Sequence, residues 1–342
     1  MKNGFDPRRL TPIASLNRVR FVESAGLVLP ADMLNRTAFE LLSAQALADL
    51  ARQHGDASDT IARRFGERLG WLIVTLRRGD VASRAARPDW DESYWRQWAR
   101  VSTIYLGGGI VGGEIGPHLV RYASRTLEAA GLADCDIRLA AWPAHLPLIG
   151  AARTAPASRS AVVFDFGQSF VKRAVARYEN GTLAALRLLP RLPARWTQLP
   201  LGHDPTLEHV RLLGNSMVQT MAETWRAAST ADSPVSPTIV ASLASYLRDG
   251  QPLARQGGAY AALLELSENL ATWLADRVSH ATGHRLTVRL LHDGTAAAYA
   301  RAGEPCAAVI TLGTALGVGF PPDSWSGCPL SSRFTVLDAV PS

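Results

Sequence analysis

Apolar and polar residues along this chain follow two different periods, which predict alternating helices and strands. Some segments repeat their apolar residues at the spacing of one helix face, whereas others are short apolar runs typical of buried strands. The predicted helices are 37–53, 60–78, 88–100, 117–131, 206–229 and 259–281, with a further helix start at 147–152. The predicted strands are 101–106, 135–142, 238–244 and 285–293, three strands within 162–189, and a strand with a glycine-rich turn over 307–320.

Composition narrows the class of protein without naming a function. At 342 residues and 47% apolar residues the chain is long enough for two domains or one large bilobal fold with a substantial core. The net charge of +6 comes from scattered arginines, and the only lysines are Lys2 and Lys172. Because the sequence has no basic tail and no basic–aromatic stripe, we expect no nucleic-acid partner.

Cysteine usage and hydropathy predict a cytoplasmic protein. Cys135, Cys306 and Cys328 are far apart and odd in number, so they form neither a disulfide framework nor a zinc-binding cluster. The first residues lack the apolar region of a signal peptide. No apolar run reaches the ~18–20 residues of a membrane span, so we expect no membrane partner.

Four strand–turn units carry the residues that suggest chemistry. They are IYLGGGIVGG (104–113), FDFGQS (164–169), LLHDGTAAA (290–298) and ITLGTALGVG (310–319). A glycine-rich turn presents backbone N–H groups to an anion, and an Asp at a strand end can hold Mg²⁺ through water or accept a proton from a hydroxyl. Phosphoryl transfer needs these parts together.

These motifs resemble those of the ROK-type sugar kinases, within the actin/hexokinase/chaperone ATPase superfamily. The segment Asp165–Ser169 resembles the first phosphate motif, His292–Ala298 resembles the segment that contains the catalytic Asp, and Leu312–Gly319 resembles the second phosphate motif. Leu106–Ile110, with the later Leu148–Ala152, resembles the adenosine motif and the closing segment of that family. The resemblance implies a bilobal α/β fold, actin/hexokinase-like and ribonuclease H-like, with two mixed-sheet lobes around a nucleotide cleft.

The resemblance also implies an activity, which is ATP-dependent phosphorylation of a sugar or a sugar-like small molecule. Asp293 would act as the base, Asp165 would position Mg²⁺ through water, and His292 would bind the acceptor. The phosphates of ATP would be held by Gly167, Gln168, Ser169, Gly313 and Thr314, and the adenosine site would be lined by Gly107, Gly108 and Gly109. Homodimers are common in the family, so a homodimer is a further expectation.

The order of the motifs predicts a circular permutation. In the family the first phosphate motif opens the chain and the adenosine motif closes it, whereas here the closing segment comes first. We therefore expect a large lobe from 37–152 plus 306–342, a small lobe from 153–305, and an irregular N-terminal segment, 1–36. The strand at 101–106 should then share a sheet with the strand that begins at 307.

Several residues depart from the family pattern and leave alternatives open. Gln168 replaces a glycine and His292 replaces an Asn, while the sugar motif and the zinc-binding cysteines of the family are missing. A catalytically impaired sugar- or nucleotide-binding sensor is therefore an alternative. A lesser alternative is a dinucleotide-binding oxidoreductase, because Gly107–Gly112 matches GxGxxG, although the next strand ends without the acidic residue that would hold a ribose.

Overall fold

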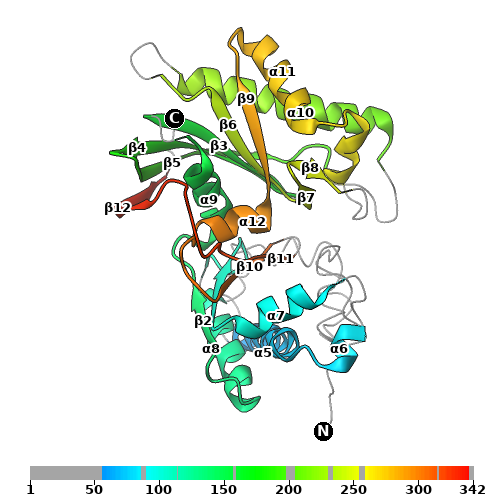
Figure 1. The fold of residues 1–342 in the computed structure, drawn as a ribbon, viewed down its shortest axis with the longest axis vertical. Coiled ribbons are helices and arrows are strands. Elements are labelled where there is room, and N and C mark those ends of the chain that lie inside the picture. Colours follow the sequence, from blue (N-terminus) through cyan, green and yellow to red (C-terminus); the bar gives the residue numbers. More distant parts are fainter. Residues whose placement is uncertain are drawn as a thin grey trace. The chain divides into compact units, whose positions relative to one another are not determined.

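The fold is described from a computed structural model, and the described residues are 56–85, 90–113, 115–156, 159–197, 205–229, 234–253, 259–313 and 316–338. The predicted segment 1–36 and the predicted helix 37–53 lie outside them. The chain is an α/β protein with mixed sheets and helices, as predicted (Figure 1). It divides into two compact units, which are residues 1–146 with 303–323, and residues 147–302 with 324–342. We call these unit 1 and unit 2.

Unit 1 contains a four-stranded sheet in the order β11-β10-β1-β2. The central strands β1 (Thr103–Gly107) and β10 (Ala307–Leu312) are parallel, and β2 (Asp136–Leu139) is parallel to β1. The edge strand β11 (Leu316–Gly319) returns antiparallel to β10. The predicted pairing of the strand at 101–106 with the strand at 307 is therefore confirmed.

Helices complete unit 1, and two glycines determine how two of them pack. Among the described residues of this unit, the helices are α5 (Asp56–Arg78), α6 (Val81–Ala85), α7 (Glu92–Arg100) and α8 (Ile115–Ala129), with a 3-10 turn at Pro143–His145. A Cβ on Gly66 or Gly70 of α5 would lie 2.6 Å from the Cβ of Tyr122 or Thr126 on α8. Only glycine allows the two backbones to approach this closely, so Gly66 and Gly70 determine how α5 packs against α8.

Unit 2 contains a six-stranded sheet in the order β12-β5-β4-β3-β6-β9. The three strands predicted within 162–189 are β3 (Ser160–Phe166), β4 (Phe170–Glu179) and β5 (Thr182–Pro193), which form an antiparallel meander. The strands β6 (Thr238–Leu243) and β9 (Thr287–His292) run parallel to β3. A small hairpin pairs β7 (Leu247–Arg248) with β8 (Gln251–Pro252).

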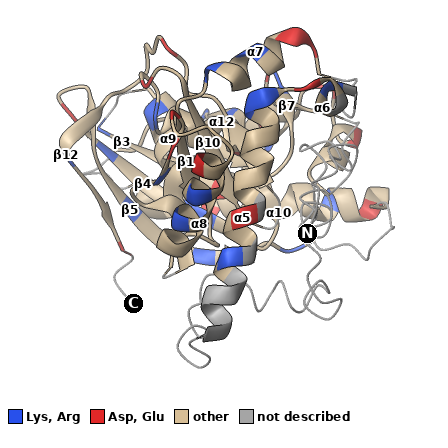
Figure 2. Cartoon of the chain, turned by 90° about the horizontal axis from the view of Figure 1, so that it is seen from below, with Lys and Arg blue, Asp and Glu red and all other residues tan. Residues whose placement is uncertain are grey.

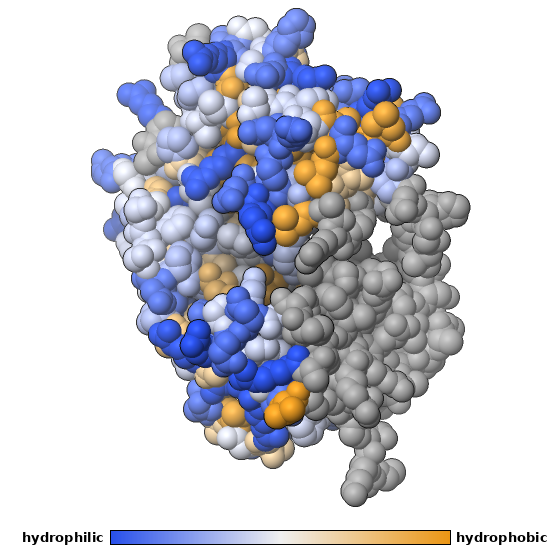
Figure 3. Space-filling model, turned by 45° about the vertical axis from the view of Figure 1, so that its right-hand side comes forward, coloured by the Kyte–Doolittle hydropathy of each residue, from blue (hydrophilic) through white to orange (hydrophobic). Residues whose placement is uncertain are grey.

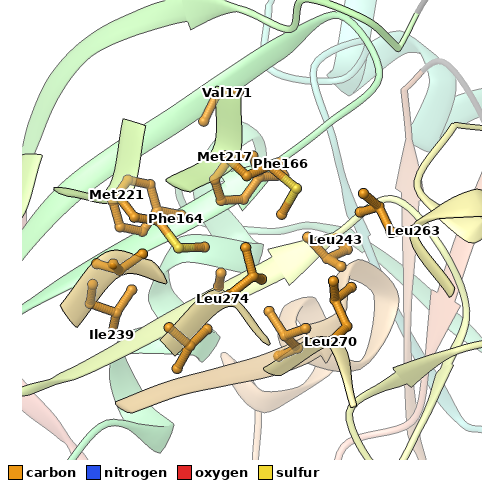
Figure 4. Packing of buried hydrophobic residues seen from close by; sticks show 14 of the residues in the cluster. Phe164, Phe166, Val171, Met217, Met221, Ile239, Leu243, Leu263, Leu270 and Leu274 are labelled. Carbon is orange, nitrogen blue, oxygen red and sulfur yellow. The ribbon is translucent and has the colours of Figure 1, made fainter. Parts of the chain in front are cut away.

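Helices lie on both faces of this sheet (Figure 1). One face packs against α10 (Leu207–Ala228), α11 (Leu270–Thr282) and the 3-10 turn Ala261–Glu265. The apolar cluster between them contains Phe164, Met217 and Leu274 (Figure 4), and burial of each such side chain stabilises the fold by about 1.5–3 kcal/mol. The other face carries α9 (Leu146–Thr154) and α12 (Asp293–Tyr299).

Two differences between the predicted and the observed elements are larger than the shifts of a few residues at other element ends. The helix predicted over 259–281 begins only at Leu270, because Asn269 accepts the Thr272 N–H and caps it there, and the preceding residues form the 3-10 turn. The C-terminal residues were expected with the strand at 307, but β12 (Leu330–Leu337) pairs with β5, in the sheet of unit 2. This pairing gives β5 a second neighbour and leaves β12 as the edge.

Charged and apolar residues alternate on the surface. Figure 2 shows Lys and Arg segments on several elements, among them α8 and β5, with acidic segments between them. On the face drawn in Figure 3, apolar residues outside the grey atoms occur as separate patches among hydrophilic ones. Both features are those of an ordinary protein surface.

Candidate active site

Three parallel strands of unit 2 end side by side, and most of the predicted site residues of this unit lie at these ends. Phe166 of β3 pairs with Leu243 of β6, which in turn pairs with His292 of β9. Because the three strands are parallel, their carboxyl ends meet at one edge of the sheet, where open α/β sheets bind ligands. The segments Asp165–Ser169 and His292–Asp293 are far apart in the sequence. In the sheet, only β6 lies between their strands, β3 and β9.

Asp165 is a buried carboxylate with a partner on each oxygen. Its Oδ2 lies 3.0 Å from Lys172 Nζ, and its Oδ1 accepts a hydrogen bond from Ser242 Oγ at 3.0 Å. These side chains meet because Asp165 of β3 lies directly opposite Lys172 of β4 and next to Ser242 of β6. Asp165 is 4% exposed, so the ammonium group compensates a charge that is largely removed from water.

Asp293 is the first residue of α12 and keeps one carboxylate oxygen without a donor. Its Oδ1 accepts the Gly294 N–H at 2.7 Å and also lies 3.1 Å from His292 Nε2. Within the described part of the chain, no group donates to Oδ2. The Asp293 side chain is 29% exposed, so this recessed carboxylate retains access to solvent.

Desolvation raises the pKa of Asp293 above its ordinary value, and it is the largest effect on that group. The neighbouring His292 lowers this pKa, Asp165 raises it, and the Gly294 N–H and Lys172 lower it. A carboxylate with a raised pKa is a stronger proton acceptor than a free one. The environment therefore favours proton transfer to Asp293.

His292 is buried and both of its ring nitrogens have partners. Its Nδ1 accepts the Thr295 N–H at 3.3 Å, which caps α12, and its Nε2 faces Asp293. The ring stacks on Tyr246, with centroids 4.3 Å apart. Burial lowers the pKa of His292 more than Asp293 raises it, which favours the neutral imidazole.

In the turn between β3 and β4, one of the backbone N–H groups predicted to hold phosphate is already used. Gly167 N–H donates to Phe170 O at 3.1 Å and closes the turn. The side chain of Gln168, the residue that replaces a glycine of the family motif, donates to Ala244 O at 3.2 Å. The Gln168 N–H has no acceptor among the described residues, whereas the carbonyls of Gly167, Gln168 and Ser169 accept from Tyr260, Thr197 and Ala194.

The two glycine-rich motifs of unit 1 lie against each other. Gly108 has a φ of +96°, and a Cβ there would come within 2.3 Å of Leu312 O, so this position requires glycine. The Gly108 N–H donates to Pro143 O at 2.7 Å, and the Ile110 N–H donates to Leu312 O at 3.1 Å. Gly109 has open space on its Cβ side.

These contacts bring the predicted adenosine loop next to the second phosphate motif. A Cβ on Gly107 would meet Leu146 Cδ1 at 2.4 Å, so the space beside Gly107 is filled by the Leu146 side chain. Gly313 directly follows Leu312, whereas Thr314 lies outside the described residues. Of the three predicted adenosine-site glycines, Gly109 is therefore the one with room beside it.

Close packing of α9 against α12 fixes the position of Asp293. A Cβ on Gly150 of α9 would lie 1.6 Å from Ala296 O of α12, so the two helix backbones touch. Arg153, also on α9, is 6% exposed and donates to Tyr299 O at 2.8 Å and to Cys328 O at 3.0 Å. The predicted closing segment thus supports the helix on which Asp293 lies.

The sequence did not single out the neighbours that complete the site. Lys172, Ser242, Tyr246 and Thr295 contact the predicted residues only after the strands pair. A signal for Lys172 was present, since it is one of two lysines and lies in the strand that follows Asp165. No comparable signal marked Ser242 or Tyr246.

The hollows of unit 2 are not lined by the candidate site residues. Two hollows of about 380 and 440 Å³ are lined by residues of α10 and α11 and by residues near Trp325, and neither is lined by Asp165 or Asp293.

In the part of the chain that the structure describes, no three His, Cys, Asp or Glu residues are grouped as metal ligands. No helix in that part is both long and apolar enough to cross a membrane.

Comparisons with known proteins find little that is similar to this chain. No family model and no curated protein sequence matches it. Among solved structures, an exopolyphosphatase-like protein aligns with a TM-score of 0.31 and 12% sequence identity, over 69% of this chain and 87% of the other.

Proposed function

We propose that this protein transfers the γ-phosphoryl group of MgATP to a hydroxyl of a sugar or a sugar-like small molecule, with Asp293 as the base. The observation that carries the proposal is the state of the Asp293 carboxylate. Its Oδ1 is fixed by Gly294 N–H and His292, and its Oδ2 has no donor among the described residues. A held carboxylate with one open oxygen is the group needed to take a proton from an attacking hydroxyl.

The surroundings of Asp293 support phosphoryl transfer over proton transfer alone. The turn at Gly167–Ser169 begins from the neighbouring parallel strand, and its Gln168 N–H has no acceptor among the described residues. Lys172 adds a positive charge beside this turn, 3.0 Å from Asp165. A backbone donor, a cation and a base at one sheet edge are the groups by which proteins bind phosphate and activate a hydroxyl.

The Asp165 carboxylate has the donor atoms that a water-mediated Mg²⁺ site needs. Each oxygen of Asp165 accepts one donor, so each retains a lone pair that can accept a metal-bound water. Mg²⁺ would neutralise charge on the phosphates when bound. In unit 2, Gln168 and Ser169 would bind phosphate oxygens.

The fold proposal is a circularly permuted ROK-type kinase of the actin/hexokinase class. The parallel pairing of β1 with β10 supports it, because it joins the predicted adenosine strand to the second phosphate strand. The packing of Gly150 on Ala296 also supports it, because the predicted closing segment supports the helix of the base. A homodimer remains a prediction from the resemblance.

A sensor that binds sugar or nucleotide without turnover is the second candidate. It is favoured by Asp165, whose two oxygens already accept from Lys172 and Ser242, and by the missing sugar motif. A dinucleotide-binding oxidoreductase is supported less, because the Gly108 N–H, which would face a pyrophosphate, donates to Pro143 O.

The test is ADP release from MgATP across a panel of sugars and sugar-like alcohols, with Asp293→Asn beside the wild type. We expect turnover with at least one acceptor, and loss of about 10²–10⁴-fold in kcat in the variant, the contribution of a general base. ATP binding, measured by calorimetry, should persist in the variant. The matched control is Asp276→Asn, an exposed Asp of α11, which should keep full activity.

Other outcomes would replace the proposal. Nucleotide or sugar binding without turnover would support the sensor. Turnover that Asp293→Asn leaves unchanged would remove Asp293 from the mechanism.

A further inference from the structure

His292 has no free ring nitrogen with which to bind an acceptor. Nδ1 accepts the Thr295 N–H, and Nε2 lies 3.1 Å from Asp293 Oδ1. Tyr246 covers one face of the ring, and the residue is 8% exposed. A contact with the acceptor, which the family resemblance suggested, would require His292 to give up one of these partners.

The backbone donor determines the tautomer of His292. Two groups of Thr295 lie 3.3 Å from Nδ1, the backbone N–H and Oγ1. The N–H can only donate, so the helix cap requires a lone pair on Nδ1, and the hydroxyl can donate to Nδ1 as well. In a neutral imidazole the proton then lies on Nε2, which donates to the carboxylate. A second proton would break the bond from the Thr295 N–H that caps the helix and leave Thr295 Oγ1 as the acceptor at Nδ1, so the cap opposes protonation of the ring.

We infer that His292 is a positioning residue that caps α12 through Nδ1 and, by donating its Nε2–H to Oδ1 of Asp293, directs Oδ2 toward the acceptor. This inference rests on the proposed function for the role of Asp293 as base. The arrangement reverses the usual pairing of the two residue types, in which a carboxylate orients a histidine base. Here the histidine orients the carboxylate and keeps its own proton.

The direction of the expected pH effect follows from the groups that face Asp293. These are His292 on β9, Asp165 on β3, Lys172 on β4 and the N–H of Gly294. A donated hydrogen bond stabilises the ionised carboxylate, so its removal favours the protonated form. Loss of the Nε2–H donor should therefore move the titration of Asp293 to higher pH.

Two substitutions separate the two roles of the ring. In His292→Asn the short amide can still cap α12 through its oxygen, but it has no group at the position of Nε2. In His292→Gln the amide nitrogen can reach the position of Nε2, while the cap at Nδ1 is lost. The first variant tests the bond to Asp293, and the second tests the cap.

The experiment follows the carboxyl carbon of Asp293 by NMR in the full chain, labelled at Asp, without nucleotide or acceptor. Asp293→Asn assigns the signal. We expect the titration midpoint to rise in His292→Asn and to stay near the wild-type value in His292→Gln, whereas the melting temperature should fall more in His292→Gln. Nitrogen-15 spectra of the histidine rings should show Nε2 protonated and Nδ1 unprotonated at neutral pH.

Activity gives a second readout. In His292→Asn, kcat on the acid limb of the pH profile should fall about tenfold for each pH unit by which the limb moves, and it should recover at higher pH with little change in KM. A direct acceptor contact would instead raise KM at every pH.

The inference is overturned if the Asp293 midpoint is the same in the wild type and His292→Asn, or if Nδ1 carries the proton. The test of this inference is independent of the test of the proposed function, because the titrations need no substrate. The expected titrations without turnover on any acceptor would reject the kinase and leave the His292–Asp293 pairing standing.

Discussion

Asp165 is held on both of its oxygens, and at the residue scale this arrangement depends on Lys172. The carboxylate side chain is 6% exposed and that of Lys172 is 30% exposed. Removing the ammonium group leaves a buried negative charge with only Ser242 as a donor. Such a change is costly because the desolvation of the carboxylate is no longer compensated.

We therefore expect Lys172→Met to lower the free energy of unfolding by about 2–3 kcal/mol. This loss is smaller than that for breaking a fully buried ion pair, because the Lys172 side chain is partly exposed to solvent. Denaturant unfolding measures it. The matched control is Arg177→Met on the same strand, whose partner Glu179 is exposed, and its cost should stay below about 1 kcal/mol. Equal losses in the two variants would contradict the account.

A second residue-scale prediction concerns the pH dependence of stability at Asp293. Its pKa is raised in the folded state by desolvation, so the native state binds its proton more tightly than the unfolded state. The stability that this proton confers is present at low pH and is lost as pH rises through the folded-state pKa. Asn at this position carries no charge to desolvate.

Asp293→Asn should therefore melt at a higher temperature than the wild type at pH 7–8. The difference should shrink as the pH falls below the folded-state pKa, where the wild-type carboxyl is neutral as well. Thermal melts at a series of pH values measure it. A variant that is less stable than the wild type at every pH would show that the ionised carboxylate stabilises the fold.

At the scale of elements, the contact between α9 and α12 leaves no room for a side chain larger than that of glycine. A Cβ on Gly150 would lie 1.6 Å from Ala296 O, which is a backbone atom and cannot turn aside. Either the helices separate or the region unfolds. Because Asp293 begins α12, either response also displaces the carboxylate.

Gly150→Ala should destabilise the protein by about 3 kcal/mol or more, as overpacking of a close contact does. Its activity should be lost even at temperatures where it remains folded. Gly109→Ala serves as the stability control, since a Cβ there meets nothing within 4 Å, and its melting temperature should match the wild type. A fully stable Gly150→Ala would mean that the two helices are farther apart than described.

At the scale of the whole molecule, each unit is assembled from both halves of the chain. The sheet of unit 1 combines β1 and β2 with β10 and β11, and unit 2 includes α9 from the first half. A break between residues 156 and 159 would therefore separate segments that need each other. Neither half contains a complete sheet with all its helices.

We expect fragments 1–156 and 159–342 to be insoluble or partly folded when expressed singly, and to form a folded, co-purifying complex when expressed together. Circular dichroism and affinity capture through a tag on one fragment measure this. A break within the hairpin turn at Asn180–Gly181 also separates β1 and β2 from β10 and β11, so its two fragments should likewise fold only together. Two fragments that fold independently would contradict the division into these units.

The sequence by itself determined the local structure of this protein and identified its candidate site residues. The periods of apolar residues located most helices and strands, because burial of one face depends on spacing within a segment. Asp165, Gly167 and Asp293 were recognisable because each follows or ends an apolar strand. The boundary at Leu270 was missed, since the Asn269 cap competes locally with an otherwise helical pattern.

Only the tertiary structure decided how these segments pair and which side chains meet. The order of the motifs predicted that the strands at 101–106 and 307 share a sheet, but no local pattern specifies the register that pairs Thr103 with Ala307. The contact of Lys172 with Asp165 needs the register of two strands. The role of His292 likewise follows from distances, because a sequence shows neither which ring nitrogen carries the proton nor which group faces it.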